Sequence, residues 1–250
     1  MTNLILSGAN GKMGQVIAAL AKNDPSVKIR AGFDVNTLET DTFPIYATPS
    51  EYTGEADCIV DFSHPSAFDG LLDYALERKI GIVFATTGLS AEQVEKIHAA
   101  SLQIPIFYSA NMSVGVNLLI DLVTRAESVL KDSFDVEIVE KHHHRKVDAP
   151  SGTALAIADA IRENSDKNYE YVYDRHAVRQ KREENEIGIH AVRGGTIVGE
   201  HSVIFAGNDE IVEIKHTALS RDIFAEGALR AAKFLAGKPA GLYNMKNMIG

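Results

Sequence analysis

The first half of the chain alternates short, continuously apolar runs with amphipathic segments. The apolar runs are NLILS, KIRAGFD, DCIVDFS, GIVFATTG and IPIFYSAN, and the amphipathic segments include residues 12–22, 66–78 and 91–100. Strands that are apolar on both faces are typical of a parallel sheet covered by helices. The pattern therefore predicts an α/β domain of the Rossmann type, with a doubly wound parallel sheet.

The second half follows a different pattern. The amphipathic residues 114–130 precede the strand-like run FDVEIVEKHH, and IGIHAVRGGTIVGEHSVIFAGNDEIVEIKHTA then contains three strand-like runs separated by GG and GND turns. Such turns join antiparallel strands, so we expect an antiparallel meander in a second domain of α+β type. The amphipathic residues 221–236 are expected to return to the first domain as a helix. The predicted domains are residues 1–112 with 217–250, and residues 113–216.

Composition narrows the classes of partner. The chain has 250 residues, of which 45% are hydrophobic, and this is enough for a sizeable core. Its net charge of -9 disfavours nucleic acid or an anionic membrane as a general partner. The single cysteine excludes an intrachain disulfide, no apolar run reaches the roughly 20 residues of a membrane span, and no signal peptide is evident. We expect a cytoplasmic protein, in which the charge-rich residues 163–186 form an exposed, mobile connection rather than a site.

The segment GANGKMG lies between the first predicted strand and the first predicted helix. Its glycines, Gly8, Gly11 and Gly14, would let the backbone approach a pyrophosphate at the amides of a helix N-terminus. Asp34 ends the second predicted strand, 20 residues beyond Gly14, where a carboxylate can accept the hydroxyls of a ribose. A tight turn without a ligand is the alternative, which this combined context disfavours. Lys12 could meet the 2′-phosphate of NADP, whereas Asp34 would repel it, so both NADH and NADPH remain open.

Two further loops follow predicted strands, ATTG at residues 85–88 and SANMSVG at residues 109–115. Ligands of an open α/β sheet bind outside the carboxyl ends of its strands. We therefore expect both loops to border a nicotinamide. Ordinary strand-to-helix connections are the alternative interpretation of their spacing.

The segment EKHHHRKVDAPSGTAL, residues 140–155, combines three histidines with basic neighbours. Adjacent histidines without a spaced carboxylate or cysteine lack the usual geometry of metal ligands, and the neighbouring cations would repel a metal ion, so no metal site is predicted. A solvated basic loop is the simplest alternative. SGTAL predicts a helix start with Ser151 as N-cap, and free amides around Gly152 and Thr153 would suit a carboxylate.

Together, GxxGxMG, ATTG, SANMSVG and ExHHxxKxDAPSGTA resemble the motifs of the 4-hydroxy-tetrahydrodipicolinate reductases, also called dihydrodipicolinate reductases, over essentially the whole chain. The resemblance implies NAD(P)H-dependent reduction of 4-hydroxy-tetrahydrodipicolinate, a cyclic dicarboxylate, to tetrahydrodipicolinate in diaminopimelate and lysine biosynthesis. It also implies that the central domain binds the substrate and forms a homotetramer. The alternatives are another two-domain Rossmann dehydrogenase, acting on an amino acid semialdehyde or a polyol, and a cofactor-binding redox regulator without catalysis.

The resemblance also assigns roles within the basic segment. It implies that His142 is the acid/base histidine, that Lys146 is the proton donor, and that the substrate ligands are His143, Gly152 and Thr153. These roles suit the chemistry, because a ring that accepts hydride must then gain a proton, which an ammonium or imidazolium can supply.

The cofactor-binding residues implied by the resemblance are Gly8, Ala9, Asn10, Gly11, Lys12, Met13, Asp34, Ala85, Thr86, Thr87, Ser109, Ala110, Asn111 and Met112. Val35 stands where well-known members have an arginine that helps to hold the 2′-phosphate. If the histidine run stays extended, His142 and His144 share one face and His143 the other, so one of them is a bystander, and we select His144. The other histidines are predicted to be structural or surface residues: His64, His98, His176, His190, His201 and His216.

Overall fold

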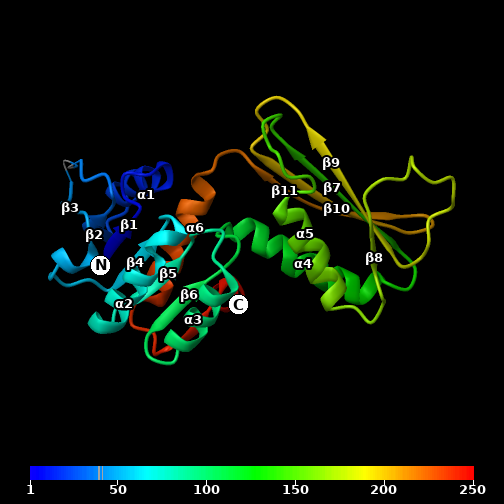
Figure 1. The fold of residues 1–250 in the computed structure, drawn as a ribbon. Coiled ribbons are helices and arrows are strands. Elements are labelled where there is room, and N and C mark those ends of the chain that lie inside the picture. Colours follow the sequence, from blue (N-terminus) through cyan, green and yellow to red (C-terminus); the bar gives the residue numbers. More distant parts are fainter. Residues whose placement is uncertain (39, 41) are drawn as a thin grey trace. The chain divides into compact units, whose positions relative to one another are not determined.

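The computed structural model describes every residue except 39 and 41. The chain divides into two compact units, residues 1–114 with 222–250 and residues 115–221 (Figure 1). Each unit has its own sheet and its own hydrophobic core. Among the described residues, no helix combines the length and the apolar character needed to cross a membrane.

The first unit is built on a parallel sheet with the strand order β12-β6-β5-β4-β1-β2-β3. The direction of winding reverses between β1 and β4, which is the switch point where doubly wound sheets bind ligands. The prediction of a Rossmann-type sheet is therefore confirmed. The strands are β1 (Thr2–Ser7), β2 (Val27–Phe33), β3 (Ile45–Tyr46), β4 (Cys58–Asp61), β5 (Gly81–Phe84), β6 (Pro105–Tyr108) and β12 (Gly241–Tyr243).

Helices cover both faces of this sheet, which explains the continuous apolar runs. Every residue of β4 and β5 is buried. One face packs on α1 and α6, for example through Ile17 and Leu229, and the other on α2 and α3, through Leu71 and Ile97 (Figure 1). The helices of the unit are α1 (Lys12–Lys22), α2 (Phe68–Arg78), α3 (Ala91–Ala100), α6 (Asp222–Leu235) and α7 (Met245–Ile249), with 3₁₀ turns at Pro49–Glu51 and Pro65–Ala67.

The second unit contains a mixed sheet with the strand order β11-β10-β7-β9-β8. One face of the sheet packs on α4 and α5 through a cluster that includes Val123, Ile138 and Ile157. The elements are α4 (Val114–Leu130), β7 (Asp135–His142), α5 (Gly152–Glu163), β8 (Glu170–Val172), β9 (Glu186–Arg193), β10 (Gly199–Ala206) and β11 (Ile211–Ala218). The predicted α+β character of this region is confirmed.

The predicted meander is correct for only one of its two turns. β10 and β11 form an antiparallel hairpin, but β9 pairs in parallel with β7, which lies between β9 and β10. The GG turn passes the end of β7 instead of closing a hairpin, since the Gly194 amide donates to the His142 carbonyl at 2.9 Å. The His144 amide in turn donates to the Gly195 carbonyl at 3.3 Å.

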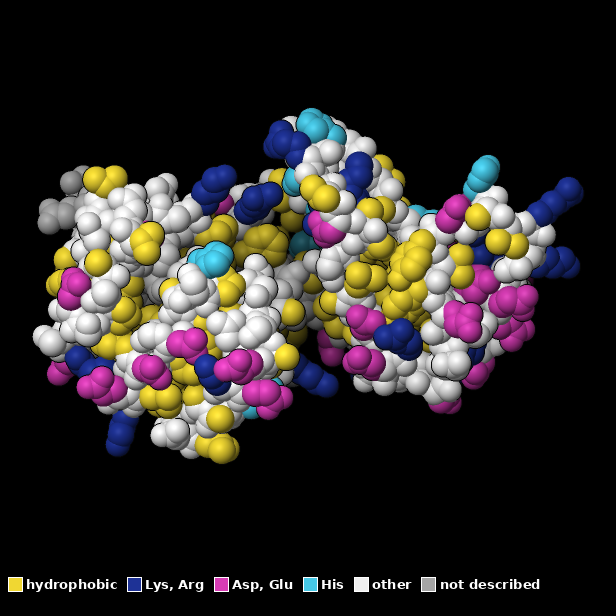
Figure 2. Space-filling model, viewed as in Figure 1, with side chains coloured by type: hydrophobic (Ala, Val, Ile, Leu, Met, Phe, Trp, Pro, Cys, Tyr) yellow, Lys and Arg dark blue, Asp and Glu magenta, His cyan; other side chains and the backbone are white. Residues whose placement is uncertain are grey.

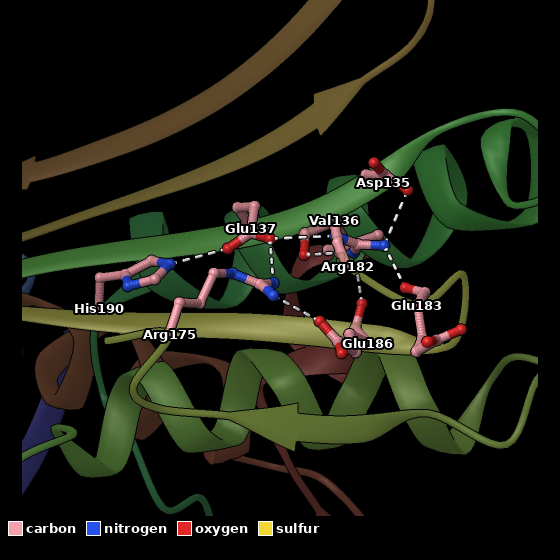
Figure 3. Close-up of polar contacts among 8 residues, drawn as sticks. All are labelled: Asp135, Val136, Glu137, Arg175, Arg182, Glu183, Glu186 and His190. Carbon is pink, nitrogen blue, oxygen red and sulfur yellow. Dashed lines mark hydrogen bonds and ion pairs between the residues drawn. The ribbon is translucent and has the colours of Figure 1, made fainter. Parts of the chain in front are cut away.

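The charge-rich segment before β9 is exposed for most of its length, as expected, but it is firmly attached (Figure 3). Arg182 Nε lies 3.1 Å from Glu137 Oε1 on β7. Arg175 bridges the carboxylates of Glu137 and Glu186 at 2.8 Å and 2.6 Å, and His190 Nε2 lies 2.8 Å from Glu137 Oε2. Burial alone would raise the pKa of Glu137, but the bonds from His190, Arg182 and Arg175 leave it lowered. The expected exposure is confirmed, and these side-chain bonds, which were not predicted, hold the segment to β7 and β9.

We predict that Arg182→Ala lowers the free energy of unfolding by about 1–3 kcal/mol, the usual cost of leaving buried acceptors unsatisfied. Arg182 also donates to the carbonyls of Val136 and Glu186, at 3.2 Å and 2.6 Å, which would lose this partner. Urea denaturation measures the change. Arg179→Ala, at an exposed position of the same segment, is the matched control, and equal losses in the two variants would contradict the assigned role.

Candidate functional site

The glycine-rich turn leaves a helix N-terminus open to a ligand. Gly8 has a φ of +76°, and a Cβ at this position would lie 2.7 Å from the Phe62 carbonyl oxygen. Gly14 packs under the turn, where a Cβ would lie 2.2 Å from the Gly8 carbonyl oxygen. α1 begins at Lys12, and its N-cap, Gly11, offers no side chain to bond the first amides. These amides are therefore available to an anion.

Asp34 fastens the end of β2 to this turn. Its Oδ2 accepts from the Asn10 amide at 2.9 Å, and its Oδ1 accepts from the Asn36 amide at 2.9 Å. A cavity of about 480 Å³ opens beside it, with Gly8, Gly11, Asp34, Val35 and His64 in its lining. Lys12 is exposed and lies outside this lining, while Ala9 is buried within the turn.

A second cavity, of about 430 Å³, joins the two predicted loops. Its lining includes Met13, residues 85–87 and residues 109–112. Phe62 and Ser63 belong to the lining of both cavities, so the two adjoin. The paired cavities at a helix N-terminus fit an elongated dinucleotide.

Several lining residues were not predicted from the sequence. Phe62 and Ser63 follow β4 at the same carboxyl edge as the other two loops, so the rule that singled out ATTG would also have found them. Phe224 comes from α6, and no local motif marks it. Asp61 is buried below the site, where Thr86 Oγ1 donates to its Oδ2 at 2.6 Å and the Ser63 amide to its Oδ1 at 3.1 Å.

The basic segment lies in the second unit, between β7 and α5. Lys, Arg and His side chains gather over the loops that follow β7 and β9 (Figure 2). Ser151 is the N-cap of α5, as predicted, because its Oγ accepts from the Ala154 amide at 3.1 Å. β7 ends at His142, so the alternation of faces does not continue to His144, which is exposed.

His142 is buried against a carboxylate. Its Nδ1 lies 2.6 Å from Glu140 Oε2, and Glu140 is fully buried. Arg193 donates to the same carboxylate through Nη1 at 2.8 Å and Nη2 at 2.6 Å, and the Ser151 amide donates to Oε1 at 3.0 Å. Burial would raise the pKa of Glu140, but these bonds leave it lowered. Glu140 therefore carries a negative charge behind the histidine.

Lys146 and His143 occupy the turn before α5. Lys146 Nζ lies 2.9 Å from Asp148 Oδ2, and this bond is the main cause of the lowered pKa of Asp148. Partial burial lowers the pKa of His143, and the charges of Arg145 and of other nearby cations lower it further. The turn thus presents an ammonium beside a neutral imidazole.

The start of α5 has room for a ligand. Gly152 is exposed, and a Cβ there would meet no atom within 4 Å, while Thr153 follows it half-buried in the first turn. The helix has no acidic residue in its first turn. The Gly152 amide already bonds the Asp148 carboxylate and helps to lower its pKa, so this helix end favours an anion, and a ligand carboxylate would replace Asp148 there.

His201 is nearer to the site than predicted. It is buried on β10 opposite Glu140, its Nε2 lies 3.1 Å from Ser151 Oγ, and its ring centroid lies 5.2 Å from that of His142. Burial lowers the pKa of His201 to about 4, with the nearby His142 as the next cause, so its ring is neutral at neutral pH. His201 lies beside His142 because β10 pairs with β7. No local sequence motif predicts that pairing. Across the described part of the chain, no group of His, Cys, Asp and Glu side chains is arranged to hold a metal ion.

Comparison with known proteins covers both units. Residues 2–112 match the family described as dihydrodipicolinate reductase, N-terminus, and residues 115–249 match dihydrodipicolinate reductase, C-terminus. The chain is 55% identical over 249 residues to the 4-hydroxy-tetrahydrodipicolinate reductase of Caldanaerobacter subterraneus subsp. tengcongensis, covering 100% of this chain and 98% of that protein. It is 47% identical to the enzyme of the same name from Clostridium tetani, covering 100% and 97%.

A solved structure shares the fold. The dipicolinate-bound dihydrodipicolinate reductase from Paenisporosarcina sp. TG-14 superimposes with a TM-score of 0.84 at 22% identity, covering 99% of each chain. The family models and the relatives of 55% and 47% identity confirm the resemblance drawn from the sequence motifs. The chain belongs to the dihydrodipicolinate reductase family, whose members are also named 4-hydroxy-tetrahydrodipicolinate reductases.

Proposed function

We propose that the chain catalyses the NAD(P)H-dependent reduction of 4-hydroxy-tetrahydrodipicolinate to tetrahydrodipicolinate in diaminopimelate and lysine biosynthesis. Family membership across both units makes it an oxidoreductase of this class. The observation that carries the proposal is the basic segment, in which Glu140 bonds both His142 and the N-cap of α5, and Lys146 lies in the turn between these two elements. A dehydrogenase acting on a semialdehyde or a polyol would not account for the basic residues of this turn. The family matches also give that alternative no support.

Family membership implies a nicotinamide cofactor, and the cavities of the first unit fit one. When bound, the cofactor supplies hydride from C4 of its nicotinamide ring. The uncapped start of α1 would receive the pyrophosphate, and the Asp34 carboxylate would receive the ribose hydroxyls. The residues proposed to hold the cofactor are Gly8, Ala9, Asn10, Gly11, Lys12, Met13, Asp34, Ala85, Thr86, Thr87, Ser109, Ala110, Asn111 and Met112.

The substrate is a dicarboxylate, so it needs two anion sites. We assign one carboxylate to the amides of Gly152 and Thr153, where the space around Gly152 is open. The other is assigned to Lys146 and His143, whose donors can form charge-assisted bonds. Because Asp148 already pairs with Lys146, a substrate carboxylate would compete with Asp148 for the ammonium.

The overall reaction adds a hydride and a proton to the substrate and removes its hydroxyl as water. We assign proton donation to the Lys146 ammonium, which can also stabilise the negative charge that develops when hydride arrives. Nδ1 of His142 is engaged by Glu140, so Nε2 is the atom of this ring that can accept or return a proton.

His142→Ala and Lys146→Ala are each expected to lower kcat by about 10²–10⁴-fold, the usual contribution of a positioned acid or base. Cofactor affinity should stay close to that of the wild type, because both residues lie outside the unit with the glycine-rich turn. Oxidation of NADH and NADPH is followed by absorbance with freshly prepared substrate. Lys141→Ala is the matched control, since Lys141 pairs with Glu200 on β10. No substrate-dependent oxidation by the wild type would refute the proposed function.

We propose that the enzyme accepts both NADH and NADPH. The cavity beside Asp34 suggests a substitution that would change its preference between them. Val35 is 97% exposed and lines that cavity. Val35→Arg would add a cation for the 2′-phosphate, and we expect it to raise the ratio of kcat/KM for NADPH to that for NADH about tenfold. Leu38→Arg, at an exposed position outside that lining, should leave the ratio unchanged. An equal response in both variants would show a general charge effect.

We also propose that the chain forms a homotetramer in the cytoplasm. β11 is an eight-residue edge strand, and apolar side chains are exposed on and near it: Ile211, Val212 and Leu219. Unpaired edges and exposed apolar groups are surfaces that another copy can cover. The free, buried Cys58 suits a reducing compartment. Sedimentation velocity should report four copies, and a stable monomer would contradict the assembly.

A further inference from the structure

The Glu140 carboxylate has every acceptor position in use. Each oxygen receives two donors, His142 and Arg193 at Oε2 and Arg193 and the Ser151 amide at Oε1. This matches the roughly four acceptor sites of an ionised carboxylate. A fully buried charge is stable only when it is compensated in this way, so the arrangement is specific.

This carboxylate determines which nitrogen of His142 carries a proton. An ionised oxygen 2.6 Å from Nδ1 requires a hydrogen on Nδ1, because two acceptors cannot face each other at that distance. The proton that the ring can exchange is then confined to Nε2. The space beside Nε2 is kept open by Gly199, where a Cβ would lie 3.1 Å from that nitrogen.

Arg193 links the same carboxylate to the turn that carries Lys146. Its Nη2 donates to the Asp148 carbonyl at 2.7 Å as well as to Glu140. The Asp148 side chain in turn holds Lys146 Nζ at 2.9 Å. One guanidinium therefore connects the group behind His142 with the residue that pairs with Lys146.

We propose that Glu140 and Arg193 are positioning residues for the acid/base pair: Glu140 holds His142 in the tautomer with its proton on Nδ1, and Arg193 holds the Lys146 turn in register with it. This inference rests on the proposed function, because it assigns an effect on the same reaction. A purely structural ion pair would support the fold alone. The two roles differ in what they predict for the tautomer of His142 and for kcat.

Glu140→Gln tests the first half of the proposal. The glutamine oxygen can keep the Ser151 amide and Arg193 Nη2, which turns the amide NH₂ toward His142 and makes Nδ1 an acceptor, while the bond from Arg193 Nη1 is lost. We expect the ring to switch to the tautomer with its proton on Nε2 and kcat to fall by about 10²-fold or more, as is typical when an acid or base is lost. KM for the cofactor should change less than about twofold, since this loss lies in the chemical step. Long-range ¹H–¹⁵N spectra of labelled protein report the tautomer.

Arg193→Lys tests the second half. Lysine keeps a positive charge for Glu140 but cannot span both Glu140 and the Asp148 carbonyl. The His142 tautomer should stay as in the wild type, while kcat falls by about 10–100-fold, as for other residues that orient catalytic groups. Wild-type kcat in this variant would overturn the role given to Arg193.

Glu127→Gln is the matched control. Glu127 is also fully buried in the second unit, where Ser165 Oγ and the Tyr169 hydroxyl donate to its Oε1 at 2.8 Å and 2.9 Å. It should retain wild-type kcat, and a loss equal to that of Glu140→Gln would assign the effect to general destabilisation and overturn the proposal.

The outcomes separate this inference from the proposed function. If the wild type does not turn over the substrate, the proposed function fails, whereas the tautomer shift in Glu140→Gln can still be observed. If the wild type turns over and Glu140→Gln keeps both kcat and tautomer, the inference fails alone. If circular dichroism shows that Glu140→Gln is unfolded, Glu140→Asp replaces it as the test. Aspartate keeps the negative charge but is too short to reach His142 in the same way. Wild-type kcat in Glu140→Asp would overturn the proposal.

Discussion

The second unit depends on the compensation of one buried charge, the carboxylate of Glu140. The inward face of β7 carries Val136 and Ile138, then Glu140 and His142, so an apolar strand becomes polar toward its carboxyl end. Donors for that end come from β9, through Arg193, and from the N-cap of α5. For Arg193 to reach Glu140, β7 must lie inside the sheet, with β9 on one side and β10 on the other. An antiparallel β9–β10 hairpin would remove Arg193 from Glu140 and leave the charge unpaired, which costs several kcal/mol.

The first unit uses a buried carboxylate for a similar purpose. Asp61 ends β4 and binds the Thr86 hydroxyl and the Ser63 amide, so it ties together the loops that follow β4 and β5. Those loops line the cavity assigned to the nicotinamide. In both units a buried carboxylate fixes the loops that we propose to contact a ligand. The groups proposed to bind the ligand can exchange partners, as Lys146 would with Asp148 in the proposed mechanism.

Local features were predicted well because local physics determines them. The sequence pattern placed helices at residues 12–22, 91–100 and 114–130, as found, and Ser151 caps α5 as expected. Strand pairing was predicted less well. The position of β7 depends on contacts between residues about fifty to sixty positions apart, such as Glu140 with Arg193 and with His201. Arg182 attaches the segment before β9 to Glu137, which is also far away in the sequence. This attachment was missed for the same reason.

The three consecutive histidines show how position decides the chemistry of a residue type. His142 is the last residue of β7 and so keeps the inward orientation that brings it to a carboxylate. His143 follows the strand, lies half-buried among cations and has a lowered pKa, which leaves it a neutral donor or acceptor for a ligand. His144 is exposed and joins the GG turn only through its backbone amide. A strand longer by two residues would have turned His144 to the inward face as well. Because β7 ends at His142, this ring lies against the carboxylate, and it is the one to which we assign the handling of a proton.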